Sequence, residues 1–246
     1  MIEPIRARWH VGRLLRRCPE TESAVRLELE VPTWPGNHAG SHLDIRLTAP
    51  DGYQATRSYS LASSGESTRV VLAVEELPGG EVSPFLVHHL AVGEEVEVHG
   101  PLGRFFVWIP SAADRTPVQL IAGGSGVVPL FAMAAARERE TEGAEFRLLY
   151  SVRTPRDVFF AEELDALSRT QVEIVHTRES PPGSSRPPGR LTRDALAAAT
   201  FPAAAGPRVY VCGPTPFVET VARWLVELGH DAVRIRTERF GGSASA

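Results

Sequence analysis

The composition of this 246-residue chain is that of an ordinary globular protein, with 43% apolar and 23% charged residues. No apolar run approaches the roughly 20 residues needed to span a bilayer, and the N-terminal segment has no signal-peptide pattern, so we expect a cytoplasmic protein without membrane insertion. The formal net charge of −4 does not indicate a nucleic-acid partner.

Cys18 and Cys212 are the only cysteines. They are too few to hold an iron–sulfur cluster or a structural zinc ion, and we interpret the adjacent His88 and His89 as solvated surface. The sequence therefore predicts no metal site. All 26 basic residues are arginine, so the guanidinium fork is the only permanent side-chain cation available to bind phosphates.

The first half of the chain has the pattern of short antiparallel strands. Apolar and polar residues alternate with a period of two, and turn signals such as Asp51-Gly52 and Gly100-Pro101 separate the runs. A short helix is expected over 83–90. The expected strands are 25–31, 42–47, 55–62, 70–77, 96–99 and 104–109. Strands of this kind predict a closed β-barrel.

The second half alternates solid apolar strands with amphipathic helices. The expected strands are 118–122, 146–151, 172–176, 209–212 and 233–237, and the expected helices are 127–140, 159–167, 191–199 and 216–228. Apolar, unpatterned strands that alternate with helices indicate a parallel sheet covered on both faces. We therefore expect two domains, a barrel over 1–112 and an α/β domain over 113–246, with a surface loop over 180–190 inside the second.

Two motifs in the first half suggest a ligand. Arg57-Ser58-Tyr59-Ser60 offers a permanent charge and a flat ring on one strand, although it also fits an ordinary strand with alternating exposure. Gly80-Glu81-Val82-Ser83 opens the short helix, where free N–H groups attract anions. Because Ser is also a common N-cap, an ordinary helix start explains this second motif equally well.

Two motifs in the second half follow buried strands. The run from Gly123 to Pro129 reads GGSGVVP and joins a strand to a helix, where a parallel sheet binds pyrophosphate. Its spacing is not that of the usual Rossmann fingerprint, and a glycine-rich turn without a ligand remains the alternative. Cys212-Gly213-Pro214 ends another strand at the same rim, where the cysteine is either a pocket residue or a small buried apolar one.

The order and spacing of these motifs, followed by Glu238-Arg239-Phe240, resemble the ferredoxin–NADP reductase superfamily. The resemblance covers nearly the whole chain. Phrases such as AGSHLDIRL, RSYSLAS and VYVCGP bring it nearest to reductases that serve bacterial oxygenases. It implies a flavin-binding barrel followed by a nicotinamide-binding domain, with FAD favoured over FMN and NADPH or NADH as the electron donor.

The resemblance also implies roles for individual residues. Ser60, Cys212 and Glu238 would surround the nicotinamide ring during hydride transfer and form the catalytic group. Flavin would be bound by Arg57, Ser58, Tyr59, Ser60, His42, Leu43, Val74, Gly80, Val82, Ser83 and Phe240. The dinucleotide would be bound by Gly124, Ser125, Gly126, Cys212, Gly213 and Pro214.

The choice of dinucleotide depends on two segments that follow neighbouring strands. Arg153 follows one strand, and Thr177-Arg178-Glu179 follows the next and resembles the Ser-Arg-Glu that clasps a 2′-phosphate in plant-type reductases. Arg153, Thr177 and Arg178 are thus expected to bind the adenosine half of the dinucleotide, with Arg156 adding positive charge. Glu179 and Asp157 oppose a dianion, so the preference for NADPH over NADH is narrow.

The electron acceptor is expected to be a separate protein, such as a ferredoxin or a monooxygenase, because this chain has neither the length nor the cysteines for a fused iron–sulfur domain. A stand-alone flavin or small-molecule reductase is the first alternative. The second is a non-catalytic electron-transfer subunit like those of dihydroorotate dehydrogenases. The second alternative is weakened because those subunits carry a C-terminal cysteine cluster that is absent here.

Overall fold

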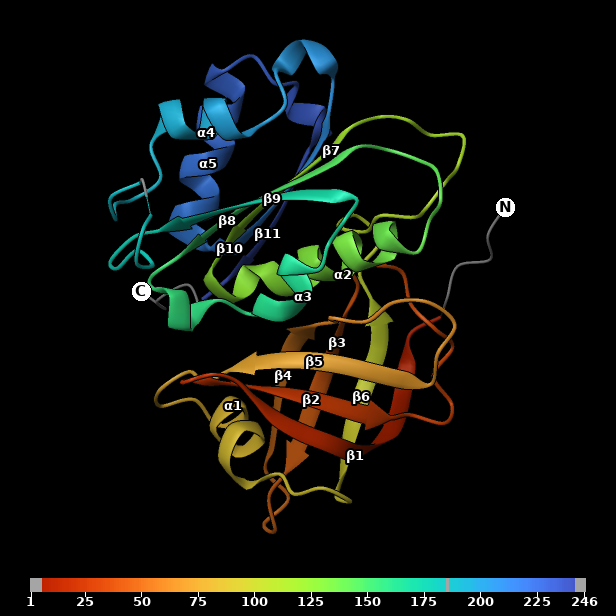
Figure 1. Ribbon diagram of the computed structural model, residues 1–246. Helices are drawn as coiled ribbons and strands as arrows, with labels where there is room; N and C mark the ends of the chain where they lie inside the picture. Colours follow the sequence, from red (N-terminus) through yellow and green to blue (C-terminus); the bar gives the residue numbers. More distant parts are fainter. Residues whose placement is uncertain (1–5, 185, 242–246) are drawn as a thin grey trace. The chain divides into compact units, whose positions relative to one another are not determined.

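The computed structural model describes residues 6–184 and 186–241. The chain divides into two compact units, Met1–Ile109 and Pro110–Ala246 (Figure 1). The first unit is built on an antiparallel sheet and the second on a parallel sheet flanked by helices, as the sequence predicts. No helix within the described residues is long and apolar enough to cross a membrane.

The first unit is a six-stranded antiparallel sheet with the order β4-β3-β6-β1-β2-β5. The edge strands β4 and β5 meet at a bridge between Leu61 and Leu72, reinforced by a 2.8 Å hydrogen bond from Ala62 N to Val71 O. The sheet therefore curls toward closure around one apolar core. Its strands are β1 (Arg8–Thr21), β2 (Ala24–Glu30), β3 (His42–Thr48), β4 (Gln54–Ser60), β5 (Arg69–Glu75) and β6 (Glu95–Leu102).

Two predictions about the strands of this unit were wrong. The long strand β1 was missed, because its arginines obscure the alternation in which His10, Gly12 and Leu14 are buried. The strand expected over 104–109 does not form; only an isolated bridge between Ala39 and Trp108 occurs there. The helix expected over 83–90 is present as α1 (Val82–Pro84) continued by a π-helical turn (Phe85–His89).

The second unit is a five-stranded parallel sheet with the order β11-β10-β7-β8-β9. Figure 1 shows α2 and α3 on one face of this sheet and α4 and α5 on the other. The strands are β7 (Val118–Gly123), β8 (Phe146–Val152), β9 (Thr170–His176), β10 (Arg208–Pro214) and β11 (Ile235–Phe240). The helices are α2 (Val127–Glu138), α3 (Ala161–Asp165), α4 (Arg193–Ala199) and α5 (Thr215–Glu227), with short 3₁₀ turns at Gly124–Gly126, Pro155–Asp157, Ala203–Ala205 and Ala232–Arg234.

A buried polar side chain fixes the middle of the parallel sheet. Gln119 on β7 is fully buried, and its amide donates to the carbonyl of Arg147 on β8 at 3.3 Å. Its amide oxygen accepts a hydrogen bond from Phe201 N at 3.1 Å, which holds the segment after α4 against the sheet. Buried polar groups of this kind are costly to leave unpaired.

We expect Gln119→Ala to lower the free energy of unfolding of this unit by about 2 kcal/mol, because it leaves Phe201 N unpaired in a small cavity. Thermal unfolding followed by circular dichroism measures the effect. Gln171→Ala, which truncates an exposed glutamine on β9, is the matched control. Equal melting temperatures for the two variants would contradict the structural role of Gln119.

Candidate functional site

Strand β4 presents the RSYS motif on two faces. Arg57 and Tyr59 lie opposite Ile45 and Leu43 of β3, whereas Ser58 and Ser60 lie opposite Asp44 and His42. Ser58 Oγ donates to Asp44 Oδ1 at 2.6 Å. The structure therefore does not bring Ser58 together with Arg57 and Tyr59, because successive side chains of a strand point to opposite faces.

Arg57 lies beside the segment that precedes α1. Its Nη1 donates to Thr56 O at 2.7 Å, and its Nη2 lies 3.5 Å from Glu81 Oε2. The side chain remains 55% exposed, so it is accessible to an anionic ligand. Tyr59 packs against the barrel core, and burial raises the pKa of its phenol to about 12, so the hydroxyl stays protonated.

The Gly80–Ser83 segment is a tight turn that leads into α1. Gly80 N donates to Leu77 O at 2.9 Å, and Ser83 Oγ accepts from Leu77 N at 3.0 Å. Val82 and Ser83 are buried. Ser83 thus closes the turn through its hydroxyl, and the exposed part of the motif next to Arg57 is Glu81.

His42, the first residue of β3, has a buried side-chain nitrogen, Nδ1, without a hydrogen-bond partner among the described residues. Burial lowers the pKa of His42, so the ring is neutral at pH 7 and has hydrogen-bonding capacity to offer a bound molecule. Its cross-strand neighbour is Ser60. Val74, in contrast, is fully buried in the barrel core on β5.

In the second unit, the glycine-rich turn after β7 packs directly on the turn after β10. A Cβ added to Gly126 would lie 2.4 Å from Cys212 O, and one added to Gly213 would lie 2.9 Å from Phe217 Cδ1. Gly124 has a left-handed φ of +55° with open space around it. Gly124 and Ser125 therefore form an open turn at the start of the twelve-residue helix α2, which fits a phosphate group.

Cys212 lies in this rim as a neutral thiol. It is 2% exposed, and burial, with the neighbouring Glu238 carboxylate, raises its pKa well above the usual range. Strand register pairs Cys212 with Glu238 and Pro214 with Phe240. The carboxyl ends of β10 and β11 therefore place Cys212 beside Glu238, with Phe240 two residues further along β11. Ser60, the third member of the predicted catalytic group, belongs to the first unit.

The carboxyl ends of β8 and β9 carry unpaired arginines. Thr177 N donates to Val152 O and Arg178 N to Arg153 O, both at 2.8 Å, which joins the two segments. In the described part of the chain, the guanidinium groups of Arg153, Arg156 and Arg178 have no hydrogen-bond or ion-pair partner. Of the two acids that the sequence places nearby, Asp157 accepts hydrogen bonds from Thr154 N and Oγ1 at 2.9 and 2.8 Å.

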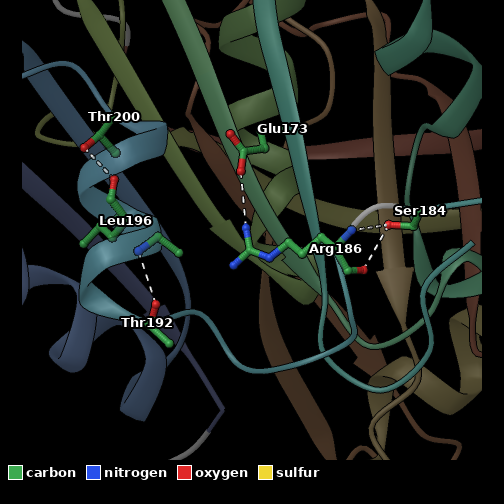
Figure 2. Close-up of polar contacts among 7 residues, drawn as sticks. Glu173, Ser184, Arg186, Thr192, Leu196 and Thr200 are labelled. Atoms are coloured by element: carbon green, nitrogen blue, oxygen red, sulfur yellow. Dashed lines mark hydrogen bonds and ion pairs between the residues drawn. The ribbon is translucent and has the colours of Figure 1, made fainter.

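A fourth arginine of this region is engaged elsewhere. Figure 2 shows Arg186, in the loop after β9, paired with Glu173 on that strand, with an Nη1–Oε1 distance of 3.4 Å. Ser184 Oγ donates to Arg186 O at 3.0 Å and helps to fix the loop. Arg186 therefore has a structural role, whereas the three arginines at the ends of β8 and β9 are available to an anion.

Sequence reasoning missed three contributors to these regions. Tyr53 forms a hydrogen bond with Glu81 beside Arg57, and Phe217 on α5 packs under both Gly123 and Gly213. Glu81 lies in a predicted motif but was given no role, and an isolated Tyr carries no pattern that would single it out. The described residues contain no cluster of His, Cys, Asp and Glu side chains suited to a metal ion.

These features define a two-unit scaffold with candidate ligand-binding residues in each unit, and comparison with known proteins gives its family. Residues 19–107 match the oxidoreductase FAD-binding domain and residues 120–223 the oxidoreductase NAD-binding domain. The chain therefore belongs to the FAD- and NAD-binding oxidoreductases with the ferredoxin–NADP reductase fold, which confirms the predicted fold class, family and cofactor types.

The relatives are redox proteins. The chain is 33% identical over 215 residues to the glycine betaine monooxygenase reductase subunit of Chromohalobacter salexigens, and 30% identical over 219 residues to the reductase component of propane 2-monooxygenase from Mycolicibacterium smegmatis. These alignments cover 85% and 84% of this chain but only 56% and 60% of the relatives. The FAD/NAD-binding domain of nitric oxide dioxygenase from Vibrio cholerae superposes with a TM-score of 0.81, at 25% identity, over 95% of this chain and 99% of that domain.

The glycine packing gives a test of the dinucleotide rim, by which we mean the turn Gly124–Gly126 after β7 and residues 212–214 at the end of β10. We expect Gly126→Ala to weaken NAD(P)H binding at least tenfold and to lower the melting temperature, because a Cβ 2.4 Å from Cys212 O must push the two turns apart. Gly189→Ala, where a Cβ meets nothing within 4 Å, is the control. Titration of dinucleotide fluorescence and thermal unfolding measure both effects, and wild-type affinity in Gly126→Ala would contradict the contact.

Proposed function

We propose that this protein is a flavin-dependent NAD(P)H reductase that passes electrons to a separate redox protein. The observation that carries the proposal is the presence, in one chain, of matched FAD-binding and NAD-binding domains. Arg57 in the first unit is 55% exposed, and Gly124 in the second has open space around it. When bound, FAD supplies the chemistry, since it accepts a hydride and releases single electrons. The amino-acid residues supply binding, orientation and charge.

Nine of the predicted site residues have a proposed task. Arg57 binds a flavin phosphate, Tyr59 lies against the flavin, and His42 and Ser60 offer hydrogen bonds from the edge of β3 and β4. Gly124, Ser125 and Gly126 hold the dinucleotide pyrophosphate. Cys212, as a neutral thiol, positions the nicotinamide with Glu238, without acting as a nucleophile; its raised pKa supports this role.

The acceptor is proposed to be the terminal protein of an oxygenase system. Two relatives are named as reductase components of monooxygenases, and a third is the electron transfer component of toluate 1,2-dioxygenase from Pseudomonas putida. We assign flavin binding to residues 1–112 and dinucleotide binding to 113–246, which agrees with the break between the compact units within three residues. We further propose that the protein acts in the cytoplasm, where NAD(P)H is available.

The proposed activity is tested on purified protein supplied with FAD. We expect NAD(P)H to bleach the flavin spectrum within seconds, and cytochrome c reduction to rise when a ferredoxin or an oxygenase component is added. Arg57→Ala should lose flavin, since each charge-assisted contact contributes roughly 1.5–3 kcal/mol; Arg69→Ala, an exposed ion-paired arginine on β5, is the control. A protein that binds no flavin would refute the proposal, and turnover with small acceptors alone would favour a stand-alone reductase.

The unpaired arginines favour NADPH as the donor. Arg153, Arg156 and Arg178 bring positive charge to the ends of β8 and β9, and a 2′-phosphate is the group of NADPH that a guanidinium fork binds best. Asp157 is committed to its hydrogen bonds with Thr154, although it still contributes negative charge. The three guanidinium groups outnumber the carboxylates of Asp157 and Glu179, and the net positive charge favours the phosphorylated dinucleotide.

Arg178→Ala is expected to lower kcat/KM for NADPH by roughly 10- to 100-fold while changing that for NADH less than threefold, because it removes a charge-assisted contact to the 2′-phosphate. Steady-state kinetics with both donors measure the ratio. Arg186→Ala provides the control, since this arginine is already paired with Glu173. A wild-type preference for NADH that neither variant alters would overturn the assignment.

A further inference from the structure

An exposed tyrosine is held in place beside the proposed flavin-phosphate site. Tyr53 lies in the turn between β3 and β4, directly before β4, and its side chain is 57% exposed. Its backbone is fixed by the turn: Tyr53 N donates to Asp51 Oδ1 at 3.0 Å, and Tyr53 O accepts from Ala49 N at 2.8 Å. Gly52 supplies the left-handed residue of this turn, with φ of +89°.

The side chain of Tyr53 is fixed at its tip as well. Its hydroxyl donates to Glu81 Oε1 at 3.0 Å, and the second oxygen of the same carboxylate lies 3.5 Å from Arg57 Nη2. The hydrogen bond to Glu81 raises the pKa of Tyr53, so the phenol remains a donor. One carboxylate thus connects the tyrosine ring to the arginine.

The faces of this ring have no stacking partner. No aromatic ring or guanidinium group in residues 6–184 and 186–241 packs on Tyr53, whereas Trp9, another exposed aromatic residue of this unit, has Arg46 over its ring at 4.0 Å. An aromatic side chain immobilised at both ends loses little conformational entropy when a flat group stacks on it. The arrangement is suited to binding a planar ring next to a phosphate.

We propose that Tyr53 stacks on the adenine of FAD and thereby makes the site select FAD over FMN. The inference depends on the proposed flavin site at Arg57. FAD differs from FMN by an adenosine monophosphate, and a ligand whose phosphate contacts Arg57 has its adjoining nucleoside within reach of the ring that Glu81 holds. Tyr53 is then a specificity-determining residue and Glu81 a positioning residue.

Glu81 has a second consequence for binding. Its carboxylate is paired with the guanidinium of Arg57, and its negative charge repels any phosphate that approaches that guanidinium. Glu81→Gln removes this repulsion but retains a side-chain oxygen that accepts the Tyr53 hydrogen bond. The carboxylate therefore affects both flavins through the shared phosphate, whereas the ring affects only the flavin that carries adenine.

The experiment compares the affinities of FAD and FMN for the full-length protein after removal of its flavin, measured by flavin fluorescence titration. Tyr53→Ala should raise the Kd for FAD by roughly 5- to 150-fold, the range expected for loss of a base–aromatic stack, and change the Kd for FMN less than twofold. Tyr53→Phe should retain most of the FAD affinity, since the ring remains. Trp9→Ala, which removes an exposed aromatic residue from β1, should change neither.

The outcomes separate this inference from the proposed flavin site. If the wild-type protein binds neither flavin, the flavin site itself is refuted and the inference falls with it. If wild type binds flavin but Tyr53→Ala changes both affinities equally or leaves both unchanged, Tyr53 does not recognise adenine and only this inference is overturned. Glu81→Gln should strengthen binding of both flavins by a similar factor; strengthening of FAD alone would overturn its assignment as a residue acting at the shared phosphate.

Discussion

The close contact between two backbone turns governs the geometry of the dinucleotide rim. Gly126 approaches Cys212 so closely that a methyl group has no room, and Gly123 and Gly213 meet the ring of Phe217 in the same way. Because β7 and β10 are adjacent parallel strands, their carboxyl ends are held side by side by the sheet, and the glycines bring the following turns into contact. The turn that exposes Gly124 and Ser125 and the strand end that carries Cys212 are consequently parts of one packed unit.

The same contact determines the chemical character of the cysteine. With Gly126 packed on its carbonyl and Glu238 opposite it in the strand register, Cys212 is removed from water and kept near a negative charge. Both effects raise the pKa of the thiol. A thiol of this kind is a poor nucleophile but a compact, weakly polar group against which a flat ring can be placed. The packing thus supports the proposed role of Cys212 as a positioning group and opposes a role as a nucleophile.

The sequence predicts the second unit better than the first. Buried parallel strands such as β7 are continuous apolar runs, and their ends are marked by glycine motifs, so strand positions and the rim were both predictable. Antiparallel strands with one solvated face carry a weaker signal. The arginines of β1 obscured its alternation. The apolar run at 104–109 resembled a strand, although the only β-bridge assigned within it is that of Trp108.

The candidate site could be predicted only where a motif marks it. The RSYS motif does not reveal how β4 pairs with β3. In the observed register Ser58 lies opposite Asp44 and donates its hydroxyl to that carboxylate, away from Arg57. Likewise, no local pattern distinguishes Arg178 from Arg186. The guanidinium of Arg178 has no partner among the described residues, whereas that of Arg186 is paired with Glu173. Partners that come from distant segments are set by tertiary structure, and these partners decide whether an arginine is structural or available for a ligand.

In the proposed flavin site of the first unit, charge and aromatic stacking have different effects on binding. Arg57 is the cation of this site, but it is paired with Glu81, so an incoming phosphate gains less than it would from an unpaired guanidinium. Contacts that do not involve phosphate then add to the affinity that Arg57 provides. The ring of Tyr53, fixed by the same carboxylate that weakens the phosphate contact, supplies such a contact only to a flavin that carries a second ring system. A carboxylate that lowers affinity for every phosphate ligand can in this way raise the selectivity for FAD.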